Sequence, residues 1–164
     1  QSEAYRQQHE FNSIFLLPVN LYGPGDSIDS ENSHVIPSMI MKCLNAKRSG
    51  QKEVIVWGDG SPTREFLYVD DCADGLISCM QNYNSEDPVN IGSGEEISIA
   101  ELSNRIESIV GYEGIVKWNS SMPNGQLKRH LDIEKAYQDF GFRAKIPLEI
   151  GLKKTIDWYE KNRD

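Results

Sequence analysis

The sequence lacks the short motifs that mark a self-contained active site. No G-x-G-x-x-G turn precedes a helix, because neither Gly23/Gly25 nor Gly58/Gly60 is followed by the helix that this motif requires. P-loop, HExxH and GxSxG patterns do not occur either. The sequence therefore offers no complete active site that could be assigned from a local motif.

Cysteines and long apolar runs are also scarce. The 3 cysteines, Cys43, Cys72 and Cys79, form no CxxC pair, which favours buried thiols in a reduced compartment over a disulfide framework or a metal site. No apolar run approaches about 18 residues, and the first residues show no signal-peptide pattern, so we expect no membrane association and a cytoplasmic location. The net charge of -8, with acids and bases mixed, disfavours nucleic acid as a partner.

What is present indicates one globular α/β domain over residues 1–164. Hydrophobic residues make up 38% and charged residues 26%, and neither a repeat nor a linker interrupts the chain. Apolar spacing predicts strands over 14–17, 53–57, 64–69, 89–92 and 115–118, and helices over 1–10, 33–48, 73–83, 98–111, 132–140 and 148–161. Strands alternate with helices almost throughout, as in an α/β fold.

Three local details sharpen these predictions. The continuous apolar run 14–17, ended by Pro18, is typical of a central parallel strand buried on both faces. Asp70 and Asp71 are interpreted as the N-cap and a first-turn acid of helix 73–83, in preference to a catalytic carboxylate pair. Ser98 with Glu101 predicts a capping box.

Several segments together carry a family resemblance. Leu17–Pro24, Asn32–Pro37 and Arg64–Asp71 are, in this order and spacing, similar to the NAD-dependent epimerase/dehydratase family of extended short-chain dehydrogenases/reductases. The resemblance extends over essentially the whole chain and also includes the segments Val56–Gly58, Asn90–Gly94, Pro123–Gly125 and Leu131–Asp132. Asn32-Ser33-His34-Val35 resembles most the branch that epimerises and reduces a GDP-linked 4-keto-6-deoxy sugar with NADPH.

The resemblance implies that the chain is the C-terminal portion of such an enzyme. It would comprise the last parallel-strand region of a Rossmann-like fold and the substrate-binding α/β subdomain, with residues 1–10 as the tail of the catalytic helix. The glycine loop, the active-site Ser/Thr and the Tyr/Lys pair would lie upstream of Gln1. The upstream half would then bind most of the NADP, the parent enzyme would be a homodimer, and the isolated chain would be inactive. The alternatives are a portion of an NDP-sugar 4-epimerase or 4,6-dehydratase, and a non-catalytic sugar-nucleotide-binding module.

His34 is the predicted catalytic residue. Epimerisation beside a ketone requires proton transfer at carbon, and histidine titrates near neutral pH. In the family, the acid/base histidine lies in this Asn-Ser-His-Val context. The alternative is a helix-start histidine that bonds only to a loop. His9 and His130 lack such a context and are interpreted as surface residues.

Four residues are predicted to bind the nucleotide sugar. The resemblance gives Arg64 a diphosphate-binding role, which suits a bidentate guanidinium, and the alternative is a surface ion pair. Trp57 would pack against the base or ribose, or else close a sheet edge as a half-buried aromatic residue. Lys128 and Arg129 match a basic pair that reaches the nucleotide, although Arg129 and Met122 stand where relatives often have lysine, which leaves the nucleobase and the sugar open.

Asn20 and Leu21 match the stretch that passes the nicotinamide ring, so the resemblance makes them candidate cofactor-binding residues. The contact would be made largely through backbone groups. The alternative for a loop asparagine is a purely structural role.

Overall fold

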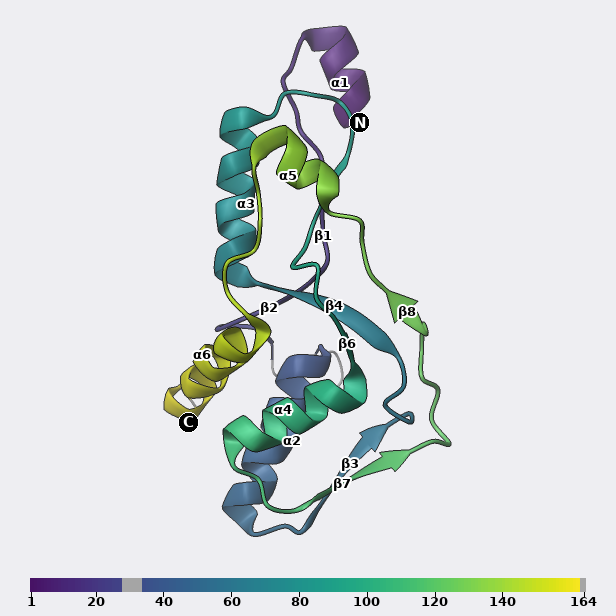
Figure 1. Ribbon diagram of the computed structural model, residues 1–164, viewed down its shortest axis with the longest axis vertical. Helices are drawn as coiled ribbons and strands as arrows, with labels where there is room; N and C mark the ends of the chain where they lie inside the picture. The colour runs from purple at the N-terminus through teal and green to yellow at the C-terminus, as the bar shows by residue number, and fades with distance from the viewer. Residues whose placement is uncertain (28–33, 163–164) are drawn as a thin grey trace.

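The computed structural model describes residues 1–27 and 34–162, which form an elongated molecule (Figure 1). The helices are α1 (Ser2–His9), α2 (Val35–Ser49), α3 (Val69–Asn82), α4 (Ile99–Val110), α5 (Glu134–Phe140) and α6 (Leu148–Lys161). The strands are β1 (Leu16–Pro18), β2 (Asn20–Tyr22), β3 (Glu53–Trp57), β4 (Thr63–Tyr68), β5 (Val89–Ile91), β6 (Glu96–Ser98), β7 (Ile115–Asn119) and β8 (Lys128–Arg129).

The strands pair mainly in parallel, which confirms the predicted α/β class. β1 pairs with β5 and β3 pairs with β7, each in parallel. β4 is the centre of the remaining sheet: it is parallel to β2 and to β8 and antiparallel to β6. Parallel neighbours require crossover connections, and the intervening helices supply them.

β4 separates two hydrophobic cores. Phe66 and Tyr68 contribute to the core formed with α2, α4 and α6, in the lower part of Figure 1. Leu67 contributes to the core formed with α3, α5 and β5, in the upper part. Successive side chains of a strand point to opposite faces, so a strand covered on both faces has a continuous apolar run instead of an alternating one.

Most of the predicted elements are confirmed, with ends that shift by a few residues. β3 has the predicted bounds, and α4 begins with the predicted capping box: the Ser98 hydroxyl accepts from Glu101 N, and the Glu101 carboxylate accepts from Ser98 N. The 3 cysteines are free thiols and are buried. Within the described ranges, no helix is long and apolar enough to cross a membrane.

The predicted cap of the third helix is wrong. α3 begins at Val69, directly after β4, with Tyr68 at its N-cap, so Asp70 and Asp71 both lie in its first turn. The buried Asp71 carboxylate instead accepts hydrogen bonds from Lys145 N (3.1 Å) and Ile146 N (2.9 Å). It therefore satisfies the backbone ahead of α6 and not the start of its own helix.

The prediction of a strand buried on both faces at 14–17 is also wrong for this chain. β1 runs to Pro18, pairs among the described strands only with β5, and leaves Phe15 51% and Leu17 39% exposed. β2, β6 and β8 were not predicted, because each has only two or three residues and lies in a segment with turn-like composition.

Candidate functional site

His34 is the N-cap residue of α2, with an extended backbone (φ -63°, ψ 163°). Its side chain is 75% exposed, and Nδ1 lies 3.3 Å from Oδ2 of Asp26. This contact directs Nδ1 toward the carboxylate and leaves Nε2 available to a ligand. Asn32 and Ser33, the first two residues of the His34 motif, lie outside the described residues.

Two cavities meet at His34. The larger, of about 250 Å³, is formed by the Tyr22–Asp26 turn together with Leu21, His34 and Val69. The smaller, of about 120 Å³, is lined by Asn20, Leu21, His34, Val35, Ile36, Arg64 and Phe66. Leu21 and His34 belong to both. Each cavity is smaller than typical ligand pockets of roughly 300–1,000 Å³, so a nucleotide sugar would have to extend over both.

Four of the predicted site residues therefore converge. Arg64, on β4, faces the start of α2 across the smaller cavity, with Asn20 and Leu21 of β2 beside it. The Asn20 amide donates to the backbone oxygen of Glu65 (2.8 Å), which gives this side chain a structural contact as well. Leu21 is 37% exposed and presents an apolar surface to both cavities.

Arg64 keeps its guanidinium available. Nη1 donates to the backbone oxygen of Thr63 (2.7 Å), and a side-chain carbon added at Gly125 would lie 4.0 Å from Nη2. Within the described ranges Arg64 forms no ion pair, so the alternative reading of a surface salt bridge finds no partner there. A half-buried arginine without an ion-pair partner suits an anionic ligand.

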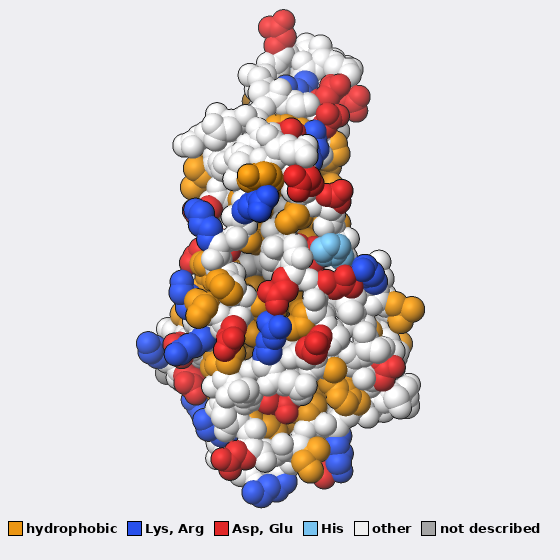
Figure 2. All heavy atoms as spheres, in the orientation of Figure 1, with side chains coloured by type: hydrophobic (Ala, Val, Ile, Leu, Met, Phe, Trp, Pro, Cys, Tyr) orange, Lys and Arg blue, Asp and Glu red, His pale blue; other side chains and the backbone are white. Residues whose placement is uncertain are grey.

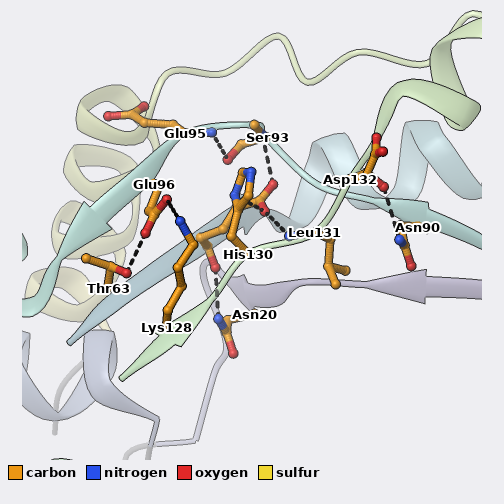
Figure 3. Close-up of polar contacts among 12 residues, drawn as sticks. Asn20, Thr63, Asn90, Ser93, Glu95, Glu96, Lys128, His130, Leu131 and Asp132 are labelled. Atoms are coloured by element: carbon orange, nitrogen blue, oxygen red, sulfur yellow. Dashed lines mark hydrogen bonds and ion pairs between the residues drawn. The ribbon is translucent and has the colours of Figure 1, made fainter. Parts of the chain in front are cut away.

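The predicted basic pair Lys128–Arg129 is divided between the two faces of the sheet. β8 pairs in parallel with β4, so that Lys128 is opposite Thr63 and Arg129 is opposite Arg64. Lys128 Nζ lies 2.7 Å from Oε2 of Glu96, an ion pair visible in Figure 3. This hydrogen bond from Lys128, and a second from the Thr63 hydroxyl, lower the pKa of Glu96.

Arg129 is exposed and forms no ion pair with the part of the chain that the structure describes. Neighbouring residues of a strand point to opposite faces of the sheet. Arg129 therefore lies on the same face as Arg64, and Lys128 lies on the other face. Like charges directly opposite one another destabilise a strand pair. The arrangement therefore favours an anion at this point.

Trp57 does not line either cavity. It is 67% exposed at the end of β3, so the reading as a half-buried sheet-edge residue does not describe it. The next residues are linked to the Pro123–Gly125 loop, because Asp59 N donates to Oδ1 of Asn124 (2.9 Å). That loop continues to Gly125, which lies near the Arg64 guanidinium.

A buried carboxylate, Glu65, was not predicted, and neither was its contact with His130. Glu65 is 0% exposed; Oε1 accepts from Gly94 N (2.8 Å) and Oε2 accepts from Leu131 N (3.1 Å). His130 is exposed, as predicted, and its Nδ1 lies 3.0 Å from the same Oε2 (Figure 3). The available signal was the acid inside the apolar strand 64–69, which needs a partner when buried.

No described group of three or more His, Cys, Asp or Glu side chains is arranged to hold a metal ion. On the face shown in Figure 2, acidic and basic side chains are interspersed and form no extended basic patch.

Known proteins resemble the chain over nearly its full length. It is 46% identical over 160 residues to "Probable GDP-L-fucose synthase 1" of Oryza sativa subsp. japonica, covering 98% of this chain and 48% of that protein. The structure of a GDP-L-fucose synthetase from Naegleria fowleri bound to NADP matches with a TM-score of 0.88 and 30% identity, over 98% of this chain and 52% of that one.

UDP-glucose 4-epimerase from Thermotoga maritima matches with a TM-score of 0.87 and 27% identity, over 99% of this chain and 50% of that one. The chain thus spans about half the length of the relatives that it matches. Residues 1–92 match the profile of the NAD dependent epimerase/dehydratase family. The chain belongs to the NAD dependent epimerase/dehydratase family.

Proposed function

We propose that the chain is the substrate-binding, C-terminal portion of a nucleotide-sugar epimerase/reductase that acts on a GDP-linked 4-keto-6-deoxy sugar. The observation that carries the proposal is that Arg64 lines the cavity beside His34, while the strand register places Arg129 opposite Arg64. A diphosphate between the two guanidinium groups relieves their repulsion and can accept two parallel hydrogen bonds from each fork.

The position of the diphosphate determines where the other parts of the substrate would lie. The sugar would extend from Arg64 toward His34, and the nucleobase would lie toward Trp57, whose exposed ring offers a stacking surface. Lys128 would act at longer range, because its ammonium group is engaged by Glu96. A GDP-linked substrate agrees with the printed name of the rice relative.

His34 would supply the proton transfer. His34 lines both cavities and its Nδ1 contacts Asp26, which leaves Nε2 to give or take a proton at the carbon next to the keto group. A 4-epimerase or a 4,6-dehydratase does not require a second proton-transfer group at this position, which favours the epimerase/reductase over those two alternatives.

The chain would touch a nicotinamide cofactor only at its edge. Leu21 presents an exposed apolar side chain at both cavities, which fits packing against a nicotinamide ring, and Asn20 lies beside it. The cofactor, expected to be NADPH, supplies hydride for the reduction. Its remaining contacts, and the parent homodimer, would depend on the other half of the protein.

The test is activity of the full-length protein with GDP-4-keto-6-deoxymannose and NADPH. We expect NADPH oxidation together with exchange of hydrogen for solvent deuterium at the carbons flanking the ketone. Interconversion of an NDP-sugar at C4 without net NADPH consumption would instead identify a 4-epimerase. Binding of the nucleotide sugar with neither reaction would favour the non-catalytic module.

A further inference from the structure

His130 and Glu65 form an ion pair on the face of β4 that points away from the cavity. Glu65 is fully buried and already accepts two backbone hydrogen bonds, from Gly94 and Leu131. His130 adds a third contact at 3.0 Å, and its 32% exposed side chain can exchange protons with solvent. Removing the charge from one partner of such a pair leaves the other buried and poorly compensated.

The strand that carries Arg129 has few other attachments. β8 has two residues, Lys128 and Arg129, and its register rests on two residue pairs with β4. Just before β8, Leu127 O accepts a hydrogen bond from Thr63 N (2.9 Å). Within β8, Lys128 forms an ion pair with Glu96. After β8, Leu131 N and His130 both contact the Glu65 carboxylate, and the Asn90 amide donates to Asp132 O (3.0 Å; Figure 3).

The docking of β8 works against charge repulsion, because it places Arg129 opposite Arg64. We infer that His130 is a positioning residue whose protonated imidazole, paired with Glu65, holds β8 in register and thereby keeps Arg129 opposite Arg64 for diphosphate binding. This inference rests on the proposed function, since it assigns His130 a role in the affinity of that same site.

His130 does not touch the ligand in this scheme. Side chains on a strand alternate, so Lys128 and His130 share one face of β8 while Arg129 lies on the other, with Arg64. His130 affects ligand binding only by keeping Arg129 in place. Pairing of β8 with β4 favours binding of the diphosphate, and bound diphosphate favours this pairing to the same extent.

Charged groups from several elements lie near His130. The charged groups near it are Glu65 of β4, Glu96 of β6, Lys128 and Arg129 of β8, Arg64 on the opposite face of β4, and Asp132 two residues further on. Carboxyl, ammonium and guanidinium groups ordinarily titrate outside pH 6–8, whereas imidazole titrates within this range. Neutral imidazole can still donate through Nδ1, but a charge-assisted bond is roughly twice as strong.

The experiment measures the affinity of the full-length protein for GDP-mannose by calorimetry between pH 6 and pH 8. Both phosphates of this probe are esterified, so its charge is constant in this range, unlike that of a terminal phosphate. The variants are His130→Gln, which retains a hydrogen-bond donor but no titration, Arg129→Ala, and the double variant. Because His34 is a second imidazole beside the site, the test compares the variants with the wild type at each pH.

In the wild type we expect the affinity to fall about 5- to 10-fold from pH 6 to pH 8. His130→Gln should remove most of this dependence, and in the Arg129→Ala background it should have no further effect. Equal pH profiles in the wild type and His130→Gln, or a full effect of His130→Gln without Arg129, would overturn the inference.

Failure of the proposed function would be recognised separately. If the wild type does not bind GDP-mannose, amide hydrogen exchange at residues 127–131, corrected for its intrinsic pH dependence, decides the question. We then expect protection to decrease from pH 6 to pH 8 in the wild type but not in His130→Gln. Identical protection in both proteins would reject the positioning role.

Discussion

The Oδ2 atom of Asp26 lies 3.3 Å from Nδ1 of His34, at the point where the turn after β2 meets the start of α2. The backbone oxygen of the same aspartate accepts a hydrogen bond from the Tyr159 hydroxyl (2.9 Å), which attaches the turn to α6. The imidazole is 75% exposed, so solvent screens this ion pair. Asp26 thus orients His34.

We expect His34→Gln in the full-length protein to slow exchange of solvent deuterium into the 4-keto sugar by about 10²–10⁴-fold, the usual contribution of a positioned acid or base. Mass spectrometry without NADPH isolates this step from hydride transfer. Substrate binding and the fold should survive. The control is His9→Gln on α1, which should retain normal exchange; a wild-type rate in His34→Gln would return His34 to a structural role.

Asp26→Asn should have a much smaller effect. An exposed ion pair contributes about 0–1 kcal/mol, which limits the loss of exchange rate to roughly fivefold. The same deuterium assay measures it, and the loss should shrink in high salt because the contact is screened. A loss as large as that of His34→Gln would mean that Asp26 takes part in the proton transfer itself.

Arg64→Ala should weaken nucleotide-sugar binding by about 10- to 100-fold, since a hydrogen bond to a charged group contributes roughly 1.5–3 kcal/mol. NADPH affinity should change little, and Arg64→Lys should restore only part of the loss because an ammonium group lacks the planar fork. Arg143→Ala is the control: Arg143 is an exposed arginine outside both cavities, and its guanidinium carbon lies 3.7 Å from the Tyr137 ring centroid. Equal losses of both ligands in Arg64→Ala would indicate a folding defect.

The purified 164-residue chain should show no NADPH oxidation in the presence of a 4-keto-sugar nucleotide. The sequence contains no glycine-rich dinucleotide motif, and no catalytic tyrosine–lysine pair was identified in it. Absorbance at the NADPH band measures the reaction, with the full-length protein as the positive control. Turnover by the isolated chain would contradict the proposed division of labour.

Tyr159 should make stability depend on pH at the alkaline end. Burial, followed by the nearby Asp26 carboxylate, raises the pKa of Tyr159 to about 12 from an ordinary value near 10. The folded state therefore holds this proton more tightly. The stabilisation is fully present below about pH 10 and is lost as the pH rises through 12, with a total of roughly 2–3 kcal/mol.

Urea titrations of the wild type and Tyr159→Phe between pH 9 and pH 12 test this. The variant should be less stable by about 1 kcal/mol at pH 9, because the bond to the Asp26 carbonyl is lost. The difference should diminish or reverse toward pH 12. Parallel pH dependences would show that Tyr159 does not contribute.

Local sequence patterns predicted the longer helices and strands, whose apolar spacing or capping residues can be recognised within the element itself. The capping residues Ser98 and Glu101 and the alternation in β3 act within a few positions, so they could be identified from the sequence. The start of α3 was misplaced because Asp71 bonds to Lys145 and Ile146, more than 70 residues away. β2, β6 and β8 exist only through pairing with β4, which no short window contains.

The resemblance supplied candidate site residues but not their geometry. Family resemblance selected Arg64, His34, Asn20 and Leu21, and the structure places them around one cavity. The division of Lys128 from Arg129 could not be predicted, because it depends on the register of a two-residue strand. Glu65 and His130 were missed for the same reason, since their contact spans distant segments.

The alternation of β4 between its two cores also determines the electrostatic character of the cavity. Adjacent residues of this strand carry opposite charges, with Arg64 turned to the cavity and Glu65 to the other face. A slip of one position would exchange the two faces of the strand. It would replace a cation by an anion at the cavity and expel Phe66 and Tyr68 from their core. Packing thus enforces the polarity of the site: the apolar residues of β4 fix the register, and the register decides which sign of ligand the cavity attracts.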